Sequence, residues 1–301
     1  YHDVADPSAE DIIGQVSAQG RRLAERLAPI GRTVAVASGK GGVGKSAVTA
    51  NLAAALAAHG LAVGAADDDL NGPSLARMLG ASSSGPLRVV DGAVEPAVGA
   101  SGVKVMSMDL LLADDDAPVA WREPELGHFI YQSTLETGAL REFLADVAWG
   151  PLDVLLIDVP PGTDKLARLV ELLPGLDLLL LVTTPSEMAR FVVAKSVRAA
   201  REAGVKELGL VANMTAYACP SCGHADPLFG ADGARELAEA AELPLWAEIP
   251  FDPRLAAATD AGRPFVLEAP EAPAARAFEA LAARVAALAN PEATPLPLGA
   301  P

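Results

Sequence analysis

The sequence predicts an α/β fold in which a mostly parallel β-sheet is flanked by helices on both faces. The apolar segments are continuous rather than alternating, as in strands that are buried on both sides. Ala-rich segments of helical periodicity separate most of them, and strands that alternate with helices form parallel sheets. A hydrophobic fraction of 51% in 301 residues supplies enough apolar side chains for a sizeable core.

The elements are expected in the following order. An amphipathic helix over 8–28 lies in an N-terminal helix or linker (1–30), one domain spans 31–289, and 290–301 form a disordered tail. Strands are expected at 33–38, 61–67, 103–108, 153–159, 177–184, 208–214 and 245–250. Helices are expected at 45–58, 125–146, 187–203 and 231–242. The Gly-, Ser- and Pro-rich segment 81–102 indicates an inserted hairpin or a mobile loop.

Charge and composition restrict the partners and the location. The net charge of −16 repels DNA phosphates and anionic membranes, so neither nucleic acid nor a membrane is an expected partner. The apolar runs are far shorter than the ~20 residues that span a bilayer. The first residues lack the basic start and apolar core of a secretory signal. Two cysteines three positions apart cannot form a disulfide framework, which favours the reducing cytoplasm.

The segment GKGGVGKS at 39–46 matches the phosphate-binding pattern G-x-x-x-x-G-K-[ST]. It follows an apolar strand and opens an Ala-rich helix, where backbone N–H groups can surround phosphate oxygens. Lys45 would then contact the β- and γ-phosphates of ATP, and the Ser46 hydroxyl would bind Mg²⁺. A plain glycine-rich turn is the alternative. The expected nucleotide-binding residues of this loop are Gly39, Lys40, Gly41, Gly42, Val43, Gly44, Lys45, Ser46 and Ala47.

Carboxylates that could complete a magnesium site end two predicted strands. Asp158 closes a buried-type strand, which is the Walker B arrangement. The run Asp67, Asp68, Asp69 closes another, and the carboxyl ends of parallel strands open onto one crevice. Asp67 and Asp69 occupy alternate positions that share a face, so Asp68 is the expected bystander. A solvated turn is the other interpretation of this run.

Lys40 lies on the N-terminal side of the loop, where most P-loops need no cation. One interpretation leaves it exposed to solvent. In the other, its ammonium reaches the nucleotide of a neighbouring subunit and stabilises transition-state charge in trans, as an arginine finger does. The pattern K-G-G-V-G-K-S resembles the deviant Walker A motif of MinD/ParA-like ATPases, which dimerise face to face over two ATP molecules. That resemblance favours the role in trans.

Cys219 and Cys222 form a C-x-x-C motif in ACPSCGHAD, on a segment expected to be an exposed loop. A thioredoxin-like redox motif follows the first strand of its own fold, whereas this one follows the sixth predicted strand. A structural zinc needs four ligands, and the loop offers two thiolates and at most His224. Two unliganded thiols are a further option. A [4Fe–4S] cluster needs four thiolates, which a symmetric dimer would supply, and a dimer-bridging zinc satisfies the same count.

Ordered sequence blocks over about residues 33–266 resemble the Mrp/ApbC family of P-loop iron–sulfur cluster carrier ATPases. They include VASGKGGVGKSAVTANLAAALAAHG, LDVLLIDVPPGTD and GLVANMTAYACPSCGHADPLFG. The resemblance implies a MinD-like P-loop NTPase fold and a homodimer that binds a [4Fe–4S] cluster between paired C-x-x-C motifs and passes it to apo-proteins. It further implies that Asn213 contacts the adenine base and that Asp69 lies near the attacking water.

Several positions depart from the family pattern. Ala47 stands where a Thr hydroxyl usually meets the α-phosphate, so nucleotide affinity is expected to be lower. The stretch DVPPGTDK replaces D-x-P-P-G-T-G-D, which leaves Asp164 without an assured role. Asn71 and Glu123 stand where Tyr and Gly are common.

Together these patterns predict an ATPase that couples ATP hydrolysis to cluster binding and transfer. Hydrolysis is expected to be slow because no residue is an evident general base. ATP would switch the dimer between geometries that hold or release the cluster received from a donor. A MinD/ParA-like positioning ATPase and a zinc-bridged ATPase dimer are the alternatives. The expected catalytic residues are Lys40, Lys45, Asp69 and Asp158, the magnesium ligands Ser46, Asp67 and Asp158, and the cluster ligands Cys219 and Cys222.

Overall fold

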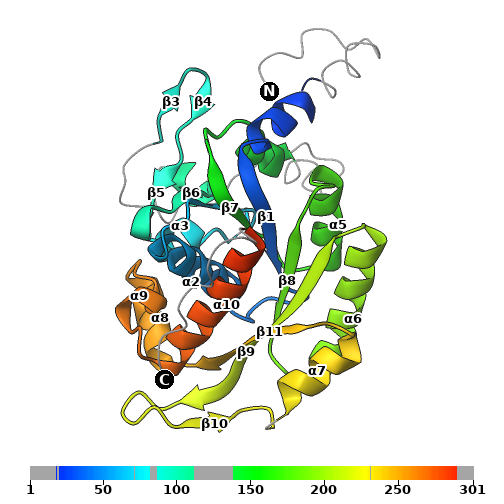
Figure 1. Cartoon of the computed structure of the whole chain (residues 1–301), viewed down its shortest axis with the longest axis vertical. Coiled ribbons are helices and arrows are strands. Elements are labelled where there is room, and N and C mark those ends of the chain that lie inside the picture. Colours follow the sequence, from blue (N-terminus) through cyan, green and yellow to red (C-terminus); the bar gives the residue numbers. More distant parts are fainter. Residues whose placement is uncertain are drawn as a thin grey trace, which may run out of the picture.

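A mostly parallel sheet runs through the centre of the computed structural model (Figure 1), which describes residues 18, 20–70, 72–81, 87–111, 138–230 and 232–289. Within these residues the strand order is β10-β9-β8-β1-β7-β2-β6-β5, and β11 pairs with β9. The strands are β1 (Ile30–Ala37), β2 (Val63–Asp67), β5 (Ala97–Val98), β6 (Lys104–Met106), β7 (Leu152–Asp158), β8 (Leu178–Thr183), β9 (Glu207–Ala218), β10 (Ala225–Pro227) and β11 (Leu245–Phe251).

The central strands are parallel, and antiparallel pairs occur with β5 and β10. β1 lies between β7 and β8. The next strand in the sequence, β2, does not pair with β1 but with the other edge of β7. Parallel strands need a crossover over one face of the sheet, and α2 (Lys45–Ala58) provides it here. The loop between β1 and α2 therefore opens at the carboxyl ends of β7 and β2, where sheets of this kind bind ligands.

Helices cover both faces of the sheet (Figure 1) and enclose two separate hydrophobic cores. On the face that α2 covers, its neighbours are α3 (Leu75–Met78), α8 (Pro253–Asp260), α9 (Phe265–Glu268) and α10 (Pro273–Ala289). On the opposite face lie α5 (Thr163–Leu172), α6 (Glu187–Glu202), α7 (Gly233–Ala241) and the helical residues 20–27 and 138–145.

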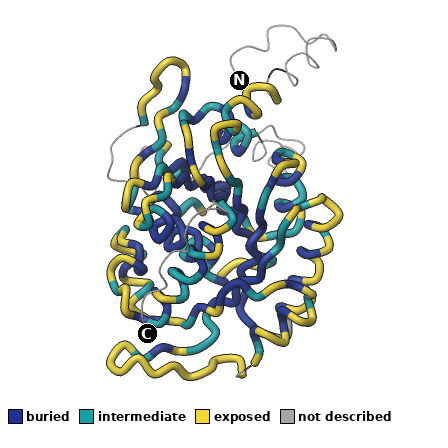
Figure 2. Tube along the Cα trace, in the orientation of Figure 1, coloured by how far each residue is buried: buried dark blue, intermediate teal, exposed yellow. Residues whose placement is uncertain are grey.

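The strands supply both cores because successive side chains point to opposite faces. In β1, Val34 and Val36 join the core under α2, whereas Ala35 and Ala37 join the core under α5 and α6. Every residue of β8 is buried, and its leucines divide between the two cores in the same way. The buried tube in the middle of the molecule follows these strands (Figure 2). This two-sided burial explains why the apolar runs of the sequence are continuous.

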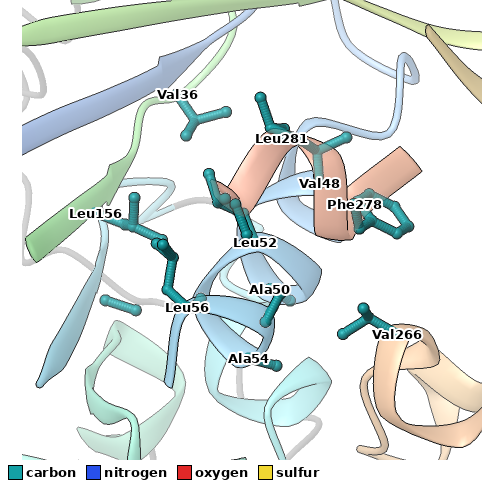
Figure 3. Packing of buried hydrophobic residues seen from close by; sticks show 14 of the residues in the cluster. Val36, Val48, Ala50, Leu52, Ala54, Leu56, Leu156, Val266, Phe278 and Leu281 are labelled. Atoms are coloured by element: carbon teal, nitrogen blue, oxygen red, sulfur yellow. The ribbon is translucent and has the colours of Figure 1, made fainter. Parts of the chain in front are cut away.

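Helix α2 is buried along most of its length, which matches its mostly apolar sequence KSAVTANLAAALAA. Leu52 and Leu56 are fully buried, and Leu56 lies beside Leu156 of β7 (Figure 3). Alanines elsewhere on the helix allow the sheet and helices α9 and α10 to approach closely, and Val266 of α9 donates its backbone N–H to Asn51 Oδ1 at 2.9 Å. The packing fixes the helix whose first residue is Lys45.

The predicted fold class is confirmed, and each of the seven predicted strands has a counterpart in the structure. The largest difference is at β9, which continues beyond residue 214 to Ala218 because it pairs there with β10 and β11. The segment 81–102 contains the antiparallel hairpin of β3 (Val89–Val90) and β4 (Ala93–Val94).

Helices α2, α6 and α7 coincide closely with three of the four predicted internal helices. Of the fourth, predicted over 125–146, residues 138–145 are helical and 125–137 lie outside the described residues. Of the predicted N-terminal helix, 20–27 are helical, and Leu23 is buried in the core under α5 and α6. The predicted tail 290–301, Asn71 and Glu123 also lie outside the described residues. No helix among the described residues is long and apolar enough to cross a membrane.

Candidate nucleotide site and cysteine hairpin

The loop between β1 and α2 has the backbone conformation of a tight phosphate-binding turn. Gly42 and Gly44 have φ angles of 78° and 80°, which glycine adopts without steric cost. A Cβ atom on Gly44 would lie 2.4 Å from Nδ2 of Asn213, so a larger residue would have to displace the Asn213 amide. The Asn213 amide donates to the Val43 carbonyl at 2.8 Å, and the Ser38 hydroxyl donates to the Lys40 carbonyl at 3.0 Å. The loop is thus held in shape from both sides.

At the base of the loop, Lys45 is paired with Asp158. Lys45 Nζ lies 2.6 Å from Asp158 Oδ2, and both side chains are almost entirely buried. The Ser46 hydroxyl donates to the same oxygen at 2.6 Å, and the Thr49 hydroxyl donates to the other oxygen, Oδ1, also at 2.6 Å. The charge of the loop lysine is therefore balanced by the carboxylate at the end of β7.

Asp67 lies next to Asp158, because their Cα atoms are register partners in the parallel pair of β2 and β7. Its Oδ2 accepts hydrogen bonds from the backbone N–H groups of Ser74 and Leu75 and from the Ser107 hydroxyl, at 2.9, 3.0 and 2.9 Å. Burial, together with the negative charge of Asp158, nevertheless raises the pKa of Asp67 from 3.8 to about 7.

The other two aspartates of the run have different surroundings. Asp69 is half-buried and its carboxylate accepts the Gly72 N–H at 3.3 Å within its own turn, while its backbone N–H donates to Asp67 Oδ1 at 3.1 Å. Asp68 is 8% exposed, and its backbone N–H donates to the Asp158 carbonyl at 3.0 Å. The structure thus brings Asp67 and Asp158 together, whereas the Asp69 carboxylate bonds within its own turn.

The remaining loop positions lie nearer the surface. Lys40 is exposed, and Ala47 is half-buried on the first turn of α2. A Cβ atom on Gly39 would overlap Val192 of α6, so glycine is required where the loop passes this helix. Asp164 lies in the first turn of α5 and is 3.9 Å from Arg168, an ion pair within that helix.

The C-x-x-C motif lies at the tip of a hairpin formed by β9 and β10 (Figure 1). The Cys219 N–H donates to the His224 carbonyl at 2.8 Å, and the Gly223 N–H donates to the Cys219 carbonyl at 2.8 Å. Cys219 is half-buried and Cys222 is exposed. Hydrogen bonds from the backbone N–H groups of Ser221 and Cys222 lower the pKa of the Cys219 thiol, which favours the thiolate that binds metals.

No group of three or more His, Cys, Asp or Glu side chains in the described part of the chain could hold a metal ion. His224 Nε2 instead lies 3.1 Å from the exposed Asp226 carboxylate. Near the hairpin, Tyr217 and Phe251 are 39% exposed and their ring centroids are 6.5 Å apart. One chain therefore presents two thiols, and the exposed ring of Tyr217 precedes the first of them by two residues.

β9 extends from the nucleotide loop to the thiols. Asn213 contacts the loop at Val43, and Cys219 follows the end of the same strand. Between them, Met214 has a φ of 58°. Asn213 pairs with Ile249 and Tyr217 pairs with Phe251, so β9 and β11 do not advance in step here, as at a β-bulge.

Thr49 and Ser107 are site residues that the sequence analysis did not identify. Thr49 is fully buried one helical turn after Lys45, and Ser107 is fully buried directly after β6. The spacing of Thr49 from the loop lysine could have identified it, since positions four apart lie on one helix face. Ser107 could have been identified as a hydroxyl at the end of a predicted strand beside the aspartates.

The donor set at this edge of the sheet fits a magnesium ion, because Mg²⁺ prefers oxygen ligands. Ser46 Oγ and Asp158 Oδ2 lie 2.6 Å apart. A glycine-rich loop between a central parallel strand and a helix, with a lysine, a hydroxyl and two strand-end carboxylates at its base, defines a P-loop nucleotide-binding protein.

Comparison with known proteins narrows this class. Residues 29–286 match the family model described as ParA: NUBPL iron-transfer P-loop NTPase, and the chain belongs to this family. The iron–sulfur cluster carrier protein of Saccharolobus solfataricus is 40% identical over 272 residues, covering 90% of this chain and 88% of that protein. That of Methanocaldococcus jannaschii is 38% identical over 262 residues, covering 87% and 86%. The predicted family resemblance is thus confirmed.

Solved structures agree with the fold. A nucleotide-binding protein from Archaeoglobus fulgidus in complex with ADP is 38% identical with a TM-score of 0.68, covering 81% of this chain and 92% of that one. The septum site-determining protein MinD of Pyrococcus horikoshii, complexed with Mg-ADP, is 26% identical with a TM-score of 0.59, covering 87% and 99%. The MinD-like fold is therefore confirmed.

Proposed function

We propose that the chain is an ATP-dependent iron–sulfur cluster carrier, active as a homodimer that binds a [4Fe–4S] cluster between two C-x-x-C motifs and passes it to apo-proteins. The observation that carries this proposal is the position of Cys219 and Cys222 on the hairpin that continues β9, the strand whose Asn213 contacts the P-loop. The names of the archaeal relatives and of the family support it.

ATP binding would exchange the partners of Lys45. Its ammonium, now on Asp158, would move to the β- and γ-phosphates, while the backbone N–H groups of residues 39–47 surround the phosphate oxygens. Ser46 and Asp158 would hold a magnesium ion directly, with the Asp67 carboxylate beside them. When bound, this ion neutralises phosphate charge. Asn213 would contact the adenine base.

Hydrolysis would depend on residues from both subunits of the dimer. Water attacks the γ-phosphorus, the bond to the ADP oxygen breaks, and inorganic phosphate leaves. Asp69 would lie near the attacking water, and Lys40 of each subunit would reach the nucleotide of the other and stabilise the transition-state charge. Lys40 is exposed on the loop, as a residue that acts in trans must be. We expect slow hydrolysis without a partner protein, since the sequence pattern assigns no residue as an evident general base for the attacking water.

The cluster is the cargo of this cycle. Two thiolates from each subunit would complete its four ligands, and the N–H groups that lower the pKa of Cys219 would favour its binding form. ATP-dependent changes in the dimer would alternately hold and release it, between a donor and acceptor proteins in the reducing cytoplasm. A zinc ion bridging the same thiolates is the alternative occupant.

A positioning ATPase is the alternative function, since the fold resembles MinD. Such a protein recruits partners to a membrane or to DNA, and a net charge of −16 opposes both surfaces. The cysteine hairpin has no role in that reading.

The carrier proposal is tested by anaerobic reconstitution with iron and sulfide. The wild type should gain the broad visible absorption of a cluster, with four irons and four sulfides per dimer. Cys219→Ser and Cys222→Ser should lose the cluster, whereas His224→Ala, a matched change on the same hairpin, should keep it. A colourless dimer that holds one zinc would refute the iron–sulfur cargo.

Coupling to ATP is tested with Lys40→Ala. Because Lys40 is exposed and proposed to act on the partner's nucleotide, this variant should bind ATP like the wild type but lose hydrolysis. The readouts are phosphate release and transfer of the cluster to an apo-ferredoxin. Unchanged hydrolysis would refute the role in trans, and unchanged transfer would refute the coupling.

A further inference from the structure

Three side chains contact Asp158, and two of them would take new partners in the proposed nucleotide cycle. Lys45 and Ser46 both contact Oδ2, and both would turn to the nucleotide or its magnesium ion when ATP binds. The third contact comes from Thr49, on the opposite oxygen Oδ1. This contact can persist while the other two are exchanged.

The Thr49 hydroxyl is committed to this contact by its geometry. Its Oγ1 lies 2.6 Å from Asp158 Oδ1 and 3.1 Å from the Lys45 carbonyl of the preceding turn. A hydroxyl has one proton to donate, and the shorter bond to a charged oxygen is the stronger of the two. Thr49 and Asp158 are both fully buried, so water cannot replace the Thr49 hydroxyl without rearrangement.

The residue type suits a fixed contact. Threonine is branched at Cβ, and few side-chain rotamers are open to it within a helix. Helix α2 is itself buried between the sheet and α10. The hydroxyl therefore projects from a rigid support, which is the property that allows a second residue to orient a metal ligand.

We propose that Thr49 is a positioning residue that fixes the Asp158 carboxylate through Oδ1 and so keeps Oδ2 directed at the magnesium ion of the bound nucleotide. The inference rests on the proposed nucleotide site. It goes beyond that site because the P-loop pattern ends at Ser46, three residues before Thr49. Thr49 itself touches neither nucleotide nor metal.

The test compares Thr49→Val, which has nearly the same shape but no hydroxyl, with Thr49→Ser, which restores it. Nucleotide affinity is measured with a fluorescent ADP analogue, in magnesium and in EDTA. Loss of a residue that orients a metal ligand typically weakens metal binding about 10- to 100-fold. We expect Thr49→Val to lose most of the magnesium-dependent gain in affinity, with its affinity in EDTA unchanged, and Thr49→Ser to regain it. If the valine variant does not fold, Thr49→Ala serves in its place.

Asn51 provides the control on the same helix. Its amide bonds to the Ala47 carbonyl and to the Val266 N–H, away from Asp158. Asn51→Ala should lower the stability of the protein yet leave the magnesium dependence of binding intact. If Thr49→Val behaves like Asn51→Ala, or if Thr49→Ser is as defective as Thr49→Val, the positioning role is wrong. A wild type that binds nucleotide equally with and without magnesium would overturn the proposed site and this role together.

Discussion

Replacing Lys45 by methionine should destabilise the nucleotide-free protein. The substitution removes the ammonium 2.6 Å from Asp158 and leaves the carboxylate almost entirely buried beside Asp67. Removal of one partner from a buried ion pair usually costs about 3–5 kcal/mol. Because the hydroxyls of Ser46 and Thr49 still donate to Asp158, we expect the lower end, about 3 kcal/mol.

The assay is equilibrium urea unfolding of four nucleotide-free proteins: wild type, Lys45→Met, Asp158→Asn and the double variant. Since the asparagine leaves no stranded charge opposite methionine, the double variant should be more stable than Lys45→Met alone. The coupling energy between the two positions should be about 2 kcal/mol. If Lys45→Met unfolds at the same urea concentration as the wild type, the ion pair does not contribute to the nucleotide-free state.

Three further predictions follow from other parts of the structure. The pKa of Asp67 is raised from 3.8 to about 7, so between these pH values the folded protein keeps a proton that the unfolded chain releases; from pH 5 to pH 8 the wild type should therefore lose about 3 kcal/mol of stability relative to Asp67→Asn in urea unfolding, and an equal pH dependence of the two proteins would contradict this. Gly44→Ala should weaken binding of a fluorescent nucleotide more than Gly42→Ala, because both positions have positive φ but only the first places a Cβ 2.4 Å from Asn213; equal affinities would contradict the close approach. Phe278→Ala should cost about 3–5 kcal/mol in urea unfolding, since the ring is 1% exposed in the core under α2, and a cost below about 1 kcal/mol would refute its packing role.

The central strands of this fold could be predicted because strands buried on both faces appear in the sequence as continuous apolar runs. Each face of β1 and β8 packs on a different core, so residues 34–37 and 178–182 are apolar throughout. The end of β9 shows no such apolar run. The residues TAYA are held in the sheet by pairing with β10 and β11, and such pairing depends on partners distant in sequence.

At the site, the sequence located the loop and the carboxylates but not their contacts. Strand-end positions brought Asp67 and Asp158 together as expected, since register follows from the parallel pairing. The pattern assigned Lys45 to phosphate, whereas in the structure its partner is Asp158. The helical spacing of Thr49 from Lys45 places its side chain on the side of the loop, but the sequence does not show that its hydroxyl reaches Asp158 of a distant strand.

The irregular pairing at Met214 divides β9 into two segments with different partners, and we call this junction the seam. β8 pairs with β9 up to Ala212, whereas from Ala216 onward β9 pairs with β10, and Tyr217 also lies opposite Phe251 of β11. Insertion or deletion at the seam would re-aim the cysteine tip and leave the nucleotide end in place. A protein engineer could therefore exchange residues 215–228 as a cassette, and Met214→Gly, which removes the steric cost of the 58° φ, is the natural first change at the junction.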